Sequence, residues 1–197
     1  RIGDDVPIHH ISRAHEIAAA RAAAEAGISP PLIHAVPGAI VMAHIDGRAL
    51  TASDIADPVM LGRIVALVRR VHAEMLHGIQ GPLASFWVFH FLRDYARGLR
   101  GSGSPFEPHI GRYVAVGDML EAAVQPTDLV FAHNDLLAAN LIDDGRRLWL
   151  IDWEFGGLDS PLFDLANLAT NNQLPHEAET AMLAAYFGHA PNAGLWR

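Results

Sequence analysis

Three short apolar runs restrict the fold of this chain more than any other feature. Each is too short for a helix and is rich in aliphatic or aromatic residues, which favours β-strands. The runs are Leu129–Phe131, Leu141–Ile142 and Leu148–Ile151. The last two are separated by Asp143-Asp144-Gly145, and because Asp-Gly is a strong turn signal, this segment predicts a hairpin. The chain must therefore build a small unit of short strands.

Most of the remaining sequence has helical patterning. In "DPVMLGRIVALVRRVHAEM" the apolar residues recur with the helical period, Asp57 can cap the first turn and Pro58 can occupy it. The predicted helices are Ile11–Gly27 with Ser12 as N-cap, Asp57–Met75, Ala84–Leu99, Glu107–Val124, Leu162–Thr170 and His176–Phe187. Apolar runs on either side of Pro37-Gly38, Leu32–Val36 and Ala39–Ile45, predict a second hairpin. Helices and strands do not alternate regularly, so the predicted class is α+β.

A break at Asp46-Gly47 divides the chain into two predicted domains. Residues 1–46 hold one helix and one hairpin. Residues 47–197 hold the other helices and the short strands, with a flexible loop at Gly101–Pro105. No internal repeat is visible.

Composition excludes several kinds of site. The chain has 197 residues and a net charge of −8. It has no cysteine, and this excludes disulfides, thiolate zinc sites and cysteine nucleophiles. All 14 basic residues are arginine, so a Walker-A phosphate loop and a lysine Schiff base are excluded. The 12 histidines lack a zinc-site spacing, and no basic patch alternates with aromatics as nucleic-acid binding would need. No apolar run reaches membrane-spanning length, and we expect a cytoplasmic protein.

Polar side chains follow the short strands at a characteristic spacing. Taken singly, Asp135, Asn140 and Asp152 could each be an ordinary turn residue. Taken together, His133-x-Asp135 with Asn140 five residues later, and then Asp152 at the end of a strand, reproduce the spacing of a kinase catalytic loop and its metal aspartate. Phosphoryl transfer needs a carboxylate that accepts the acceptor's proton and hard oxygen ligands for Mg²⁺. Asp135 is the predicted base, and Asn140 and Asp152 are the predicted metal ligands.

The stretch "FAHNDLLAANLIDDGRRLWLIDWEFGGLDSPLFDLANLATNN" resembles the choline/ethanolamine kinase and aminoglycoside phosphotransferase group, and most closely its choline kinase branch. The resemblance implies a protein-kinase-like fold, with a mostly helical large lobe and part of a small lobe. It implies ATP and Mg²⁺ as cofactors and a small-molecule hydroxyl, choline- or ethanolamine-like, as the acceptor. In this family His133 would hydrogen-bond the backbone near Asp152, and Asp164 would be a structural residue at a helix start.

The resemblance also assigns residues upstream of the catalytic loop. Glu16 aligns with the ion-pairing glutamate of the small-lobe helix, and Arg1 is the candidate for its basic partner, which would contact the phosphates. The segment "IVMAHIDGRAL" looks like the hinge between lobes, so the backbone of His44 and Ile45 would meet the adenine. The family has further strands before the basic residue and further helices at the end, so we expect this chain to be a segment of a longer kinase.

Several alternatives stay open at this stage. Glu154 is either a carboxylate that supports or faces the substrate, or a solvated turn residue. Glu154 and Asp159 are candidates for contacting a cationic acceptor, whereas Trp149 and Trp153 are expected to pack rather than to form a cation cage. The acceptor could be an aminoglycoside, or the chain could be a non-catalytic binding module with a kinase fold. The sequence does not indicate an oligomeric state.

Overall fold

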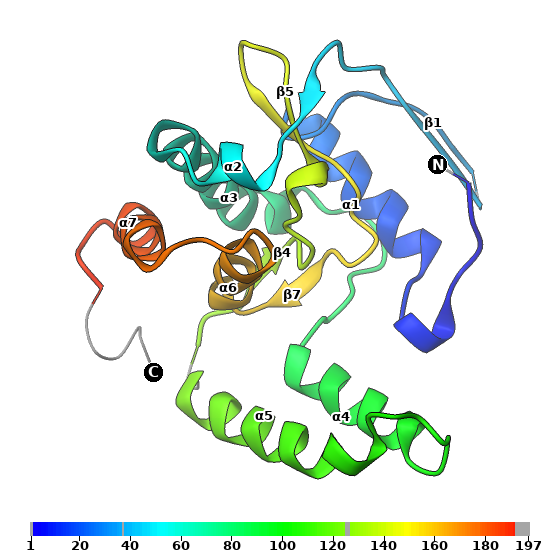
Figure 1. Cartoon of the computed structure of the whole chain (residues 1–197). Helices are drawn as coiled ribbons and strands as arrows, with labels where there is room; N and C mark the ends of the chain where they lie inside the picture. The colour runs from blue at the N-terminus through cyan, green and yellow to red at the C-terminus, as the bar shows by residue number, and fades with distance from the viewer. Residues whose placement is uncertain (1, 37, 125–126, 192–197) are drawn as a thin grey trace.

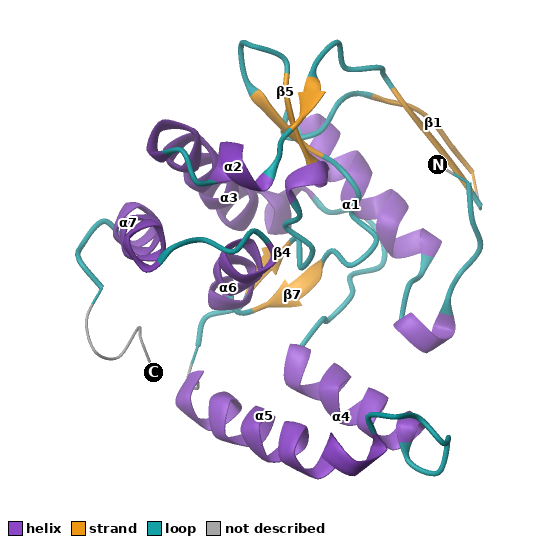
Figure 2. Ribbon diagram, viewed as in Figure 1, coloured by secondary structure: helices purple, strands orange, loops and turns teal. Residues whose placement is uncertain are grey.

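Helices and short antiparallel strands make up residues 2–36, 38–124 and 127–191, the part of the chain described by the computed structural model (Figure 1; Figure 2). The α-helices are α1 (Arg13–Glu25), α2 (Ala52–Ile55), α3 (Pro58–Gly78), α4 (Val88–Leu99), α5 (Ile110–Val124), α6 (Pro161–Asn171) and α7 (His176–Phe187). The strands are β1 (Leu32–Val36), β2 (Ala39–Met42), β3 (Arg48–Ala49), β4 (Val130–Ala132), β5 (Leu141–Asp143), β6 (Leu148–Leu150) and β7 (Gly157–Asp159), and the 3-10 helices are η1 (Pro7–His9), η2 (Glu107–His109) and η3 (Ala138–Asn140). Within this described part, no helix is both long and apolar enough to cross a bilayer.

Helix α1 is two residues shorter at each end than the sequence predicts. Ile11 is excluded from it because its backbone pairs with that of Val6. Ser12 has the extended conformation of an N-cap, but its side chain accepts no capping hydrogen bond. The Asp5 carboxylate instead accepts the Arg13 N–H at 2.7 Å. Gly27, with a φ of +65°, follows the helix in the left-handed conformation that suits glycine.

The N-terminal hairpin, β1–β2, has the predicted pairing but a shorter second strand. Val36 faces Ala39 across a turn in which Gly38 has a φ of +83°; Pro37 lies outside the described residues. Strand β2 ends at Met42 instead of Ile45, after which the Ala43 N–H bonds the Pro31 carbonyl at 2.8 Å. The segment after Ala43 is therefore irregular, which leaves its backbone groups available on one side of the cleft described below.

Helix α3 joins most of the core, because it contacts α1, α2, α7, β4 and β6. It begins as predicted: the Asp57 carboxylate accepts the N–H groups of Val59 and Met60 at 3.1 and 2.9 Å. It continues three residues beyond the predicted end, to Gly78. Its buried apolar side chains belong to the same cluster as the alanines of α1 and the leucines of α6. The core is therefore continuous across the predicted domain boundary at Asp46-Gly47.

Two small sheets position the central loops. Strands β5 and β6 form the predicted hairpin, with Leu141 opposite Leu150, and Gly145 takes a φ of +82° in the turn. The unpredicted strand β3 extends this hairpin to the order β3-β5-β6. Strand β4 pairs with β7, which the sequence did not predict either. Both sheets lie against the helical core, as Figure 2 shows in orange and purple.

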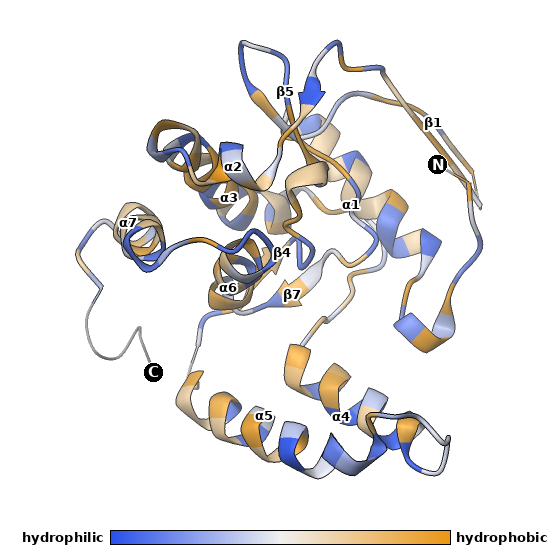
Figure 3. Ribbon diagram, viewed as in Figure 1, coloured by the Kyte–Doolittle hydropathy of each residue, from blue (hydrophilic) through white to orange (hydrophobic). Residues whose placement is uncertain are grey.

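Helices α4 and α5 form a pair at one end of the molecule (Figure 1). Helix α4 begins at Val88 rather than Ala84, because residues 84–86 run beside β7: the Ala84 carbonyl accepts the Leu158 N–H, and the Leu158 carbonyl accepts the Phe86 N–H. Residues 107–109 are 3-10 helix, so α5 begins at Ile110. Figure 3 shows apolar residues, in orange, at the start of α4 and at the end of α5.

Candidate active site

The loop after β4 is held by one buried carboxylate. Asp164, on α6, is fully buried and accepts the backbone N–H groups of His133 and Asn134 at 2.9 and 2.7 Å. Burial alone would raise the pKa of Asp164, but the hydrogen bonds from His72 and His133 outweigh burial and the pKa is lowered. Asn134 has a φ of 65°, a left-handed conformation that asparagine tolerates. Asp164 therefore fixes the sharp turn that leads into Asp135.

The His133 ring links this loop to the strand before Asp152. Its Nε2 lies 3.0 Å from the Ile151 carbonyl oxygen, so it can donate to that oxygen, and its Nδ1 accepts the Asp135 N–H at 3.3 Å. Both ring nitrogens therefore contact the backbone. The ring is fully buried against Trp153. The predicted hydrogen bond from His133 to the backbone beside Asp152 is thus present, and this ring is already committed to structural contacts.

Asp135 and Asn140 face each other. The Asn140 side-chain nitrogen donates to the Asp135 carbonyl at 2.9 Å and to its carboxylate at 3.1 Å. Burial raises the pKa of the Asp135 carboxyl, the carboxylates of Asp152 and Glu154 push it the same way, and His133 and the Asn140 bond oppose the rise. A carboxyl with a raised pKa is a better proton acceptor once it is ionised. The arrangement leaves the Asn140 side-chain oxygen without a hydrogen bond to any described residue.

Asp152 is brought to Asn140 by the β5–β6 hairpin. The Ile151 N–H donates to the Asn140 carbonyl at 3.0 Å, so the residue before Asp152 is bonded directly to the predicted amide ligand. Asp152 has a φ of 71° and turns the chain out of β6. The carboxylate of Asp152 and the amide oxygen of Asn140 are hard donors of the kind that Mg²⁺ prefers, and these two residues would hold it. In residues 2–36, 38–124 and 127–191 no group of three or more His, Cys, Asp or Glu could hold a metal ion. Two protein ligands would leave the other positions of a six-coordinate Mg²⁺ to phosphate oxygens and water.

A cleft of about 580 Å³ opens beside Asp152. Glu16 from α1 and the irregular residues His44 and Ile45, which the sequence analysis assigned to a nucleotide site, also line it. Its apolar walls come from the N-terminal hairpin, from β5 and from the segment that follows β6, and include Ile40, Met42, Ile142 and Ile151. A cleft with apolar walls and irregular backbone at one edge is suited to a flat heterocycle.

Arg13 is the residue at this site that the sequence analysis missed. Arg1, the predicted partner of Glu16, lies outside the described residues. In the structure the Arg13 guanidinium donates to the Glu16 carboxylate at 2.5 Å and reaches the Glu154 carboxylate at 3.4 Å. Burial opposes the charge on Arg13, but the two carboxylates outweigh burial and its pKa is raised. The Arg13-x-x-Glu16 spacing, one helical turn at the start of α1, was the signal available in the sequence.

The Glu154 contact decides one of the open alternatives. Its side chain is 16% exposed and ion-paired, so the solvated-turn interpretation is wrong. Trp153 packs in the core and donates its indole N–H to the Ser29 hydroxyl at 2.8 Å. Trp149 has the Arg147 guanidinium 3.4 Å from its ring centre. Trp153 therefore packs as predicted, and the cation over Trp149 comes from the chain itself.

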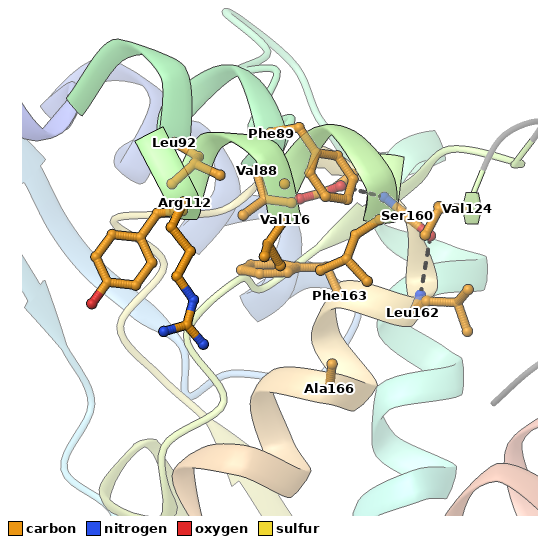
Figure 4. A pocket seen from close by; sticks show the side chains of 14 residues that line it. Val88, Phe89, Leu92, Arg112, Val116, Val124, Ser160, Leu162, Phe163 and Ala166 are labelled. Atoms are coloured by element: carbon orange, nitrogen blue, oxygen red, sulfur yellow. Dashed lines mark hydrogen bonds between the residues drawn. The ribbon is translucent and has the colours of Figure 1, made fainter. Parts of the chain in front are cut away.

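A second cavity, of about 800 Å³, lies between α4, α5 and α6 (Figure 4). Phe89, Val116 and Phe163 are among its apolar walls, and neither Asp135, Asn140 nor Asp152 lines it. Asp159, a candidate contact for a cationic acceptor, lies here and not at the cleft. Its carboxyl accepts the Ser160 N–H at 2.6 Å, its other oxygen has no hydrogen-bond partner among the described residues, and burial raises its pKa to about 7.

Comparison with known proteins agrees with this geometry. The sequence model of the choline/ethanolamine kinase family matches residues 5–184. The chain belongs to this family. The LicA protein of Haemophilus influenzae is 26% identical over 193 residues, which cover 94% of this chain and 70% of LicA. The crystal structure of a choline/ethanolamine kinase family protein from Mesorhizobium loti is 30% identical, with a TM-score of 0.76 over 93% of this chain and 62% of that chain.

A further relative, LicA crystallised in complex with AMP, has a TM-score of 0.73 at 21% identity, over 94% of this chain and 62% of that chain. The present chain thus spans about two thirds of the length of these relatives. Solved aminoglycoside phosphotransferases share its fold at lower similarity. The predicted α+β, kinase-like fold and the predicted family are confirmed.

Proposed function

We propose that this protein transfers the γ-phosphate of ATP to a hydroxyl group of a small molecule, with a choline- or ethanolamine-like alcohol as the favoured acceptor. The observation that carries the proposal is the convergence of Asp135, Asn140 and Asp152 through the hydrogen bonds of Asn140 to Asp135 and to Ile151. Family membership supports the reaction type, and the AMP complex of LicA supports nucleotide binding.

In this proposal each site residue has a distinct task. The Asp135 carboxylate accepts the proton of the acceptor hydroxyl, and the Asn140 amide orients that carboxylate. The Asp152 carboxylate and the Asn140 oxygen hold Mg²⁺, which would neutralise charge on the phosphates. His133 and Asp164 keep the loop in place through the hydrogen bonds described above.

The nucleotide and acceptor occupy different sides of this loop. The adenine lies in the cleft against the apolar walls, where the backbone of His44 and Ile45 contacts it. The sequence assigns the phosphate contact to Arg1, and Glu16, which is ion-paired with Arg13, lines the cleft. Glu154 stands on the acceptor side. The reaction takes place in the cytoplasm, where ATP is available, without nucleic acid or a membrane as partner.

The test is an acceptor-dependent release of ADP by the whole protein encoded by the gene. Choline, ethanolamine and an aminoglycoside are assayed separately with Mg²⁺-ATP, against reactions without acceptor and with EDTA. We expect release with choline or ethanolamine that EDTA abolishes. Binding of Mg²⁺-ATP without release for any acceptor would favour the non-catalytic binding module. Release with the aminoglycoside alone would correct the acceptor class.

A further inference from the structure

Arg13 contacts three separate segments of the chain beside the cleft. Its backbone N–H bonds the Asp5 carboxylate at 2.7 Å, and its Nε bonds the Asp4 carbonyl at 2.9 Å. One terminal nitrogen donates to both Glu16 and Glu154. The Arg13 side chain is only 13% exposed. The residue therefore joins the N-terminal segment, the start of α1 and the segment that follows Asp152.

The segment that carries Glu154 is held by the catalytic loop itself. The Asn134 side-chain nitrogen donates to the Phe155 carbonyl at 2.9 Å, and Trp153 is buried in the core. Glu154 thus lies between two anchored residues and follows Asp152 by two positions. A contact from Arg13 to Glu154 ties α1 to the same framework that orients Asp135.

We propose that Arg13 is a positioning residue that fixes the nucleotide side of the cleft, carried by α1, relative to the Asp152–Glu154 segment. The inference rests on the proposed function and adds to it a residue that contacts neither nucleotide nor acceptor. On this view Arg13 sets the alignment of the bound γ-phosphate over Asp135. A guanidinium suits this task because its Nε bonds the Asp4 carbonyl while one terminal nitrogen serves the two carboxylates, an arrangement that a single ammonium group does not reproduce.

The test is a double-mutant cycle with Arg13→Gln, Glu154→Gln and the double variant in the whole protein. Each protein is measured twice: by urea unfolding, and by kcat and KM for ATP and the acceptor. The exposed Arg70–Glu74 pair, one turn apart on α3, provides a matched control cycle of the same chemistry. Glu154→Gln leaves the Arg13–Glu16 bond in place, so this variant still tests the Arg13–Glu154 contact if Arg13→Gln fails to fold.

We expect Arg13→Gln and Glu154→Gln each to lower kcat about ten-fold or more, because misalignment costs rate more than binding. The double variant should be no slower than the slower single variant, and the unfolding equilibria should show a coupling of at least about three-fold. The Arg70–Glu74 cycle should leave kcat unchanged. Arg13→Lys, which keeps the charge on a single amine, should recover only part of the loss.

Three results would overturn the inference. These are multiplicative effects of the two substitutions on kcat, a folded Arg13→Gln protein with wild-type kcat, or full recovery by Arg13→Lys. If the wild-type protein phosphorylates none of the acceptors, the proposed function is wrong. The unfolding cycle then tests the Arg13–Glu154 contact separately. Additive changes in the free energy of unfolding would show that the two side chains do not interact.

Discussion

Two regions of the molecule differ in which side chains they bury and expose. One is the loop between β4 and β6, and the other is the α4–α5 pair. In the loop His133, Asn134 and Asn140 are buried and hydrogen-bonded, although the Asn134 side-chain oxygen has no partner among the described residues. In the pair few residues are buried. Large apolar side chains of α5 are instead exposed, namely Tyr113, Val116, Met119 and Leu120.

This difference indicates where the geometry is fixed. A buried hydrogen-bonded network tolerates few substitutions, because each lost partner leaves another polar group unsatisfied. An exposed helical surface tolerates many, since little packing is lost. The loop holds the proposed chemistry to a defined arrangement, whereas α4 and α5 border a large cavity. Substitutions in the two regions should therefore differ in cost, and four of them test that contrast.

Asp135→Asn should have the largest effect. The amide cannot accept the proton of an acceptor hydroxyl, so kcat should fall at least ~10²-fold. The measurement is steady-state ADP release by the whole protein. The nucleotide Kd should stay near the wild-type value, because Asp135 does not line the cleft. Wild-type turnover by this variant would remove Asp135 from the role of base.

Asp164→Asn should have the next largest effect. Asparagine keeps one oxygen, but its NH₂ group would face one of the two backbone N–H groups that now donate to Asp164, so we expect a loss of about 3 kcal/mol in the free energy of unfolding. Urea denaturation at neutral pH measures it. Asp57→Asn is the matched control, because asparagine caps a helix about as well as aspartate. A loss no larger than the control's would contradict the structural role of Asp164.

Asp159→Asn should have a smaller, pH-dependent effect of opposite sign. The folded pKa of Asp159, about 7, lies above the usual value, so the wild-type protein loses stability as pH rises from about 4 to 7. The amide removes this loss. The variant should therefore gain on the order of 2 kcal/mol over wild type at pH 8 relative to pH 5. Urea unfolding at both pH values measures it, with the exposed Asp46→Asn as control; equal pH dependence in both variants would contradict the burial of this carboxyl.

Met119→Gln should have the smallest effect. The side chain is 63% exposed on α5, and glutamine is a good helix former, so the free energy of unfolding should change by less than about 0.5 kcal/mol. Thermal unfolding of the whole protein is sufficient to measure it. A loss above about 1.5 kcal/mol would show that α5 is covered in the whole protein, and would weaken the contrast with the loop.

The sequence predicted the loop well because its information is local. Asp135, Asn140 and Asp152 are close in the sequence, and one hairpin and one hydrogen-bonded turn are enough to bring them together. The Asp57 cap and the Asp-Gly turn are equally local signals. Even the short helix α2 had one, the Thr51–Asp54 capping box, which the sequence analysis overlooked.

What the sequence could not predict depends on contacts between distant residues. Strand β7 contains a glycine and has no alternating pattern, and it exists because β4 pairs with it. Residues 84–86 read as helix, yet their backbone bonds Leu158. The predicted pairing of Glu16 with Arg1 lies outside the described residues, whereas the contact of Arg13 with Glu154 joins residues far apart in the sequence. The burial of Asp159 likewise follows from packing, not from its neighbours in sequence.

The most direct test of the central claim is Mg²⁺-ATP binding by the wild-type protein, Asp152→Ala and Asp135→Asn, measured by calorimetry with and without EDTA. The account predicts that Asp152→Ala weakens Mg²⁺-dependent ATP binding at least about ten-fold, because a carboxylate ligand is lost. Asp135→Asn should bind as the wild type does. Unchanged Mg²⁺-ATP affinity in Asp152→Ala would contradict the assignment of Asp152 and Asn140 as the metal site.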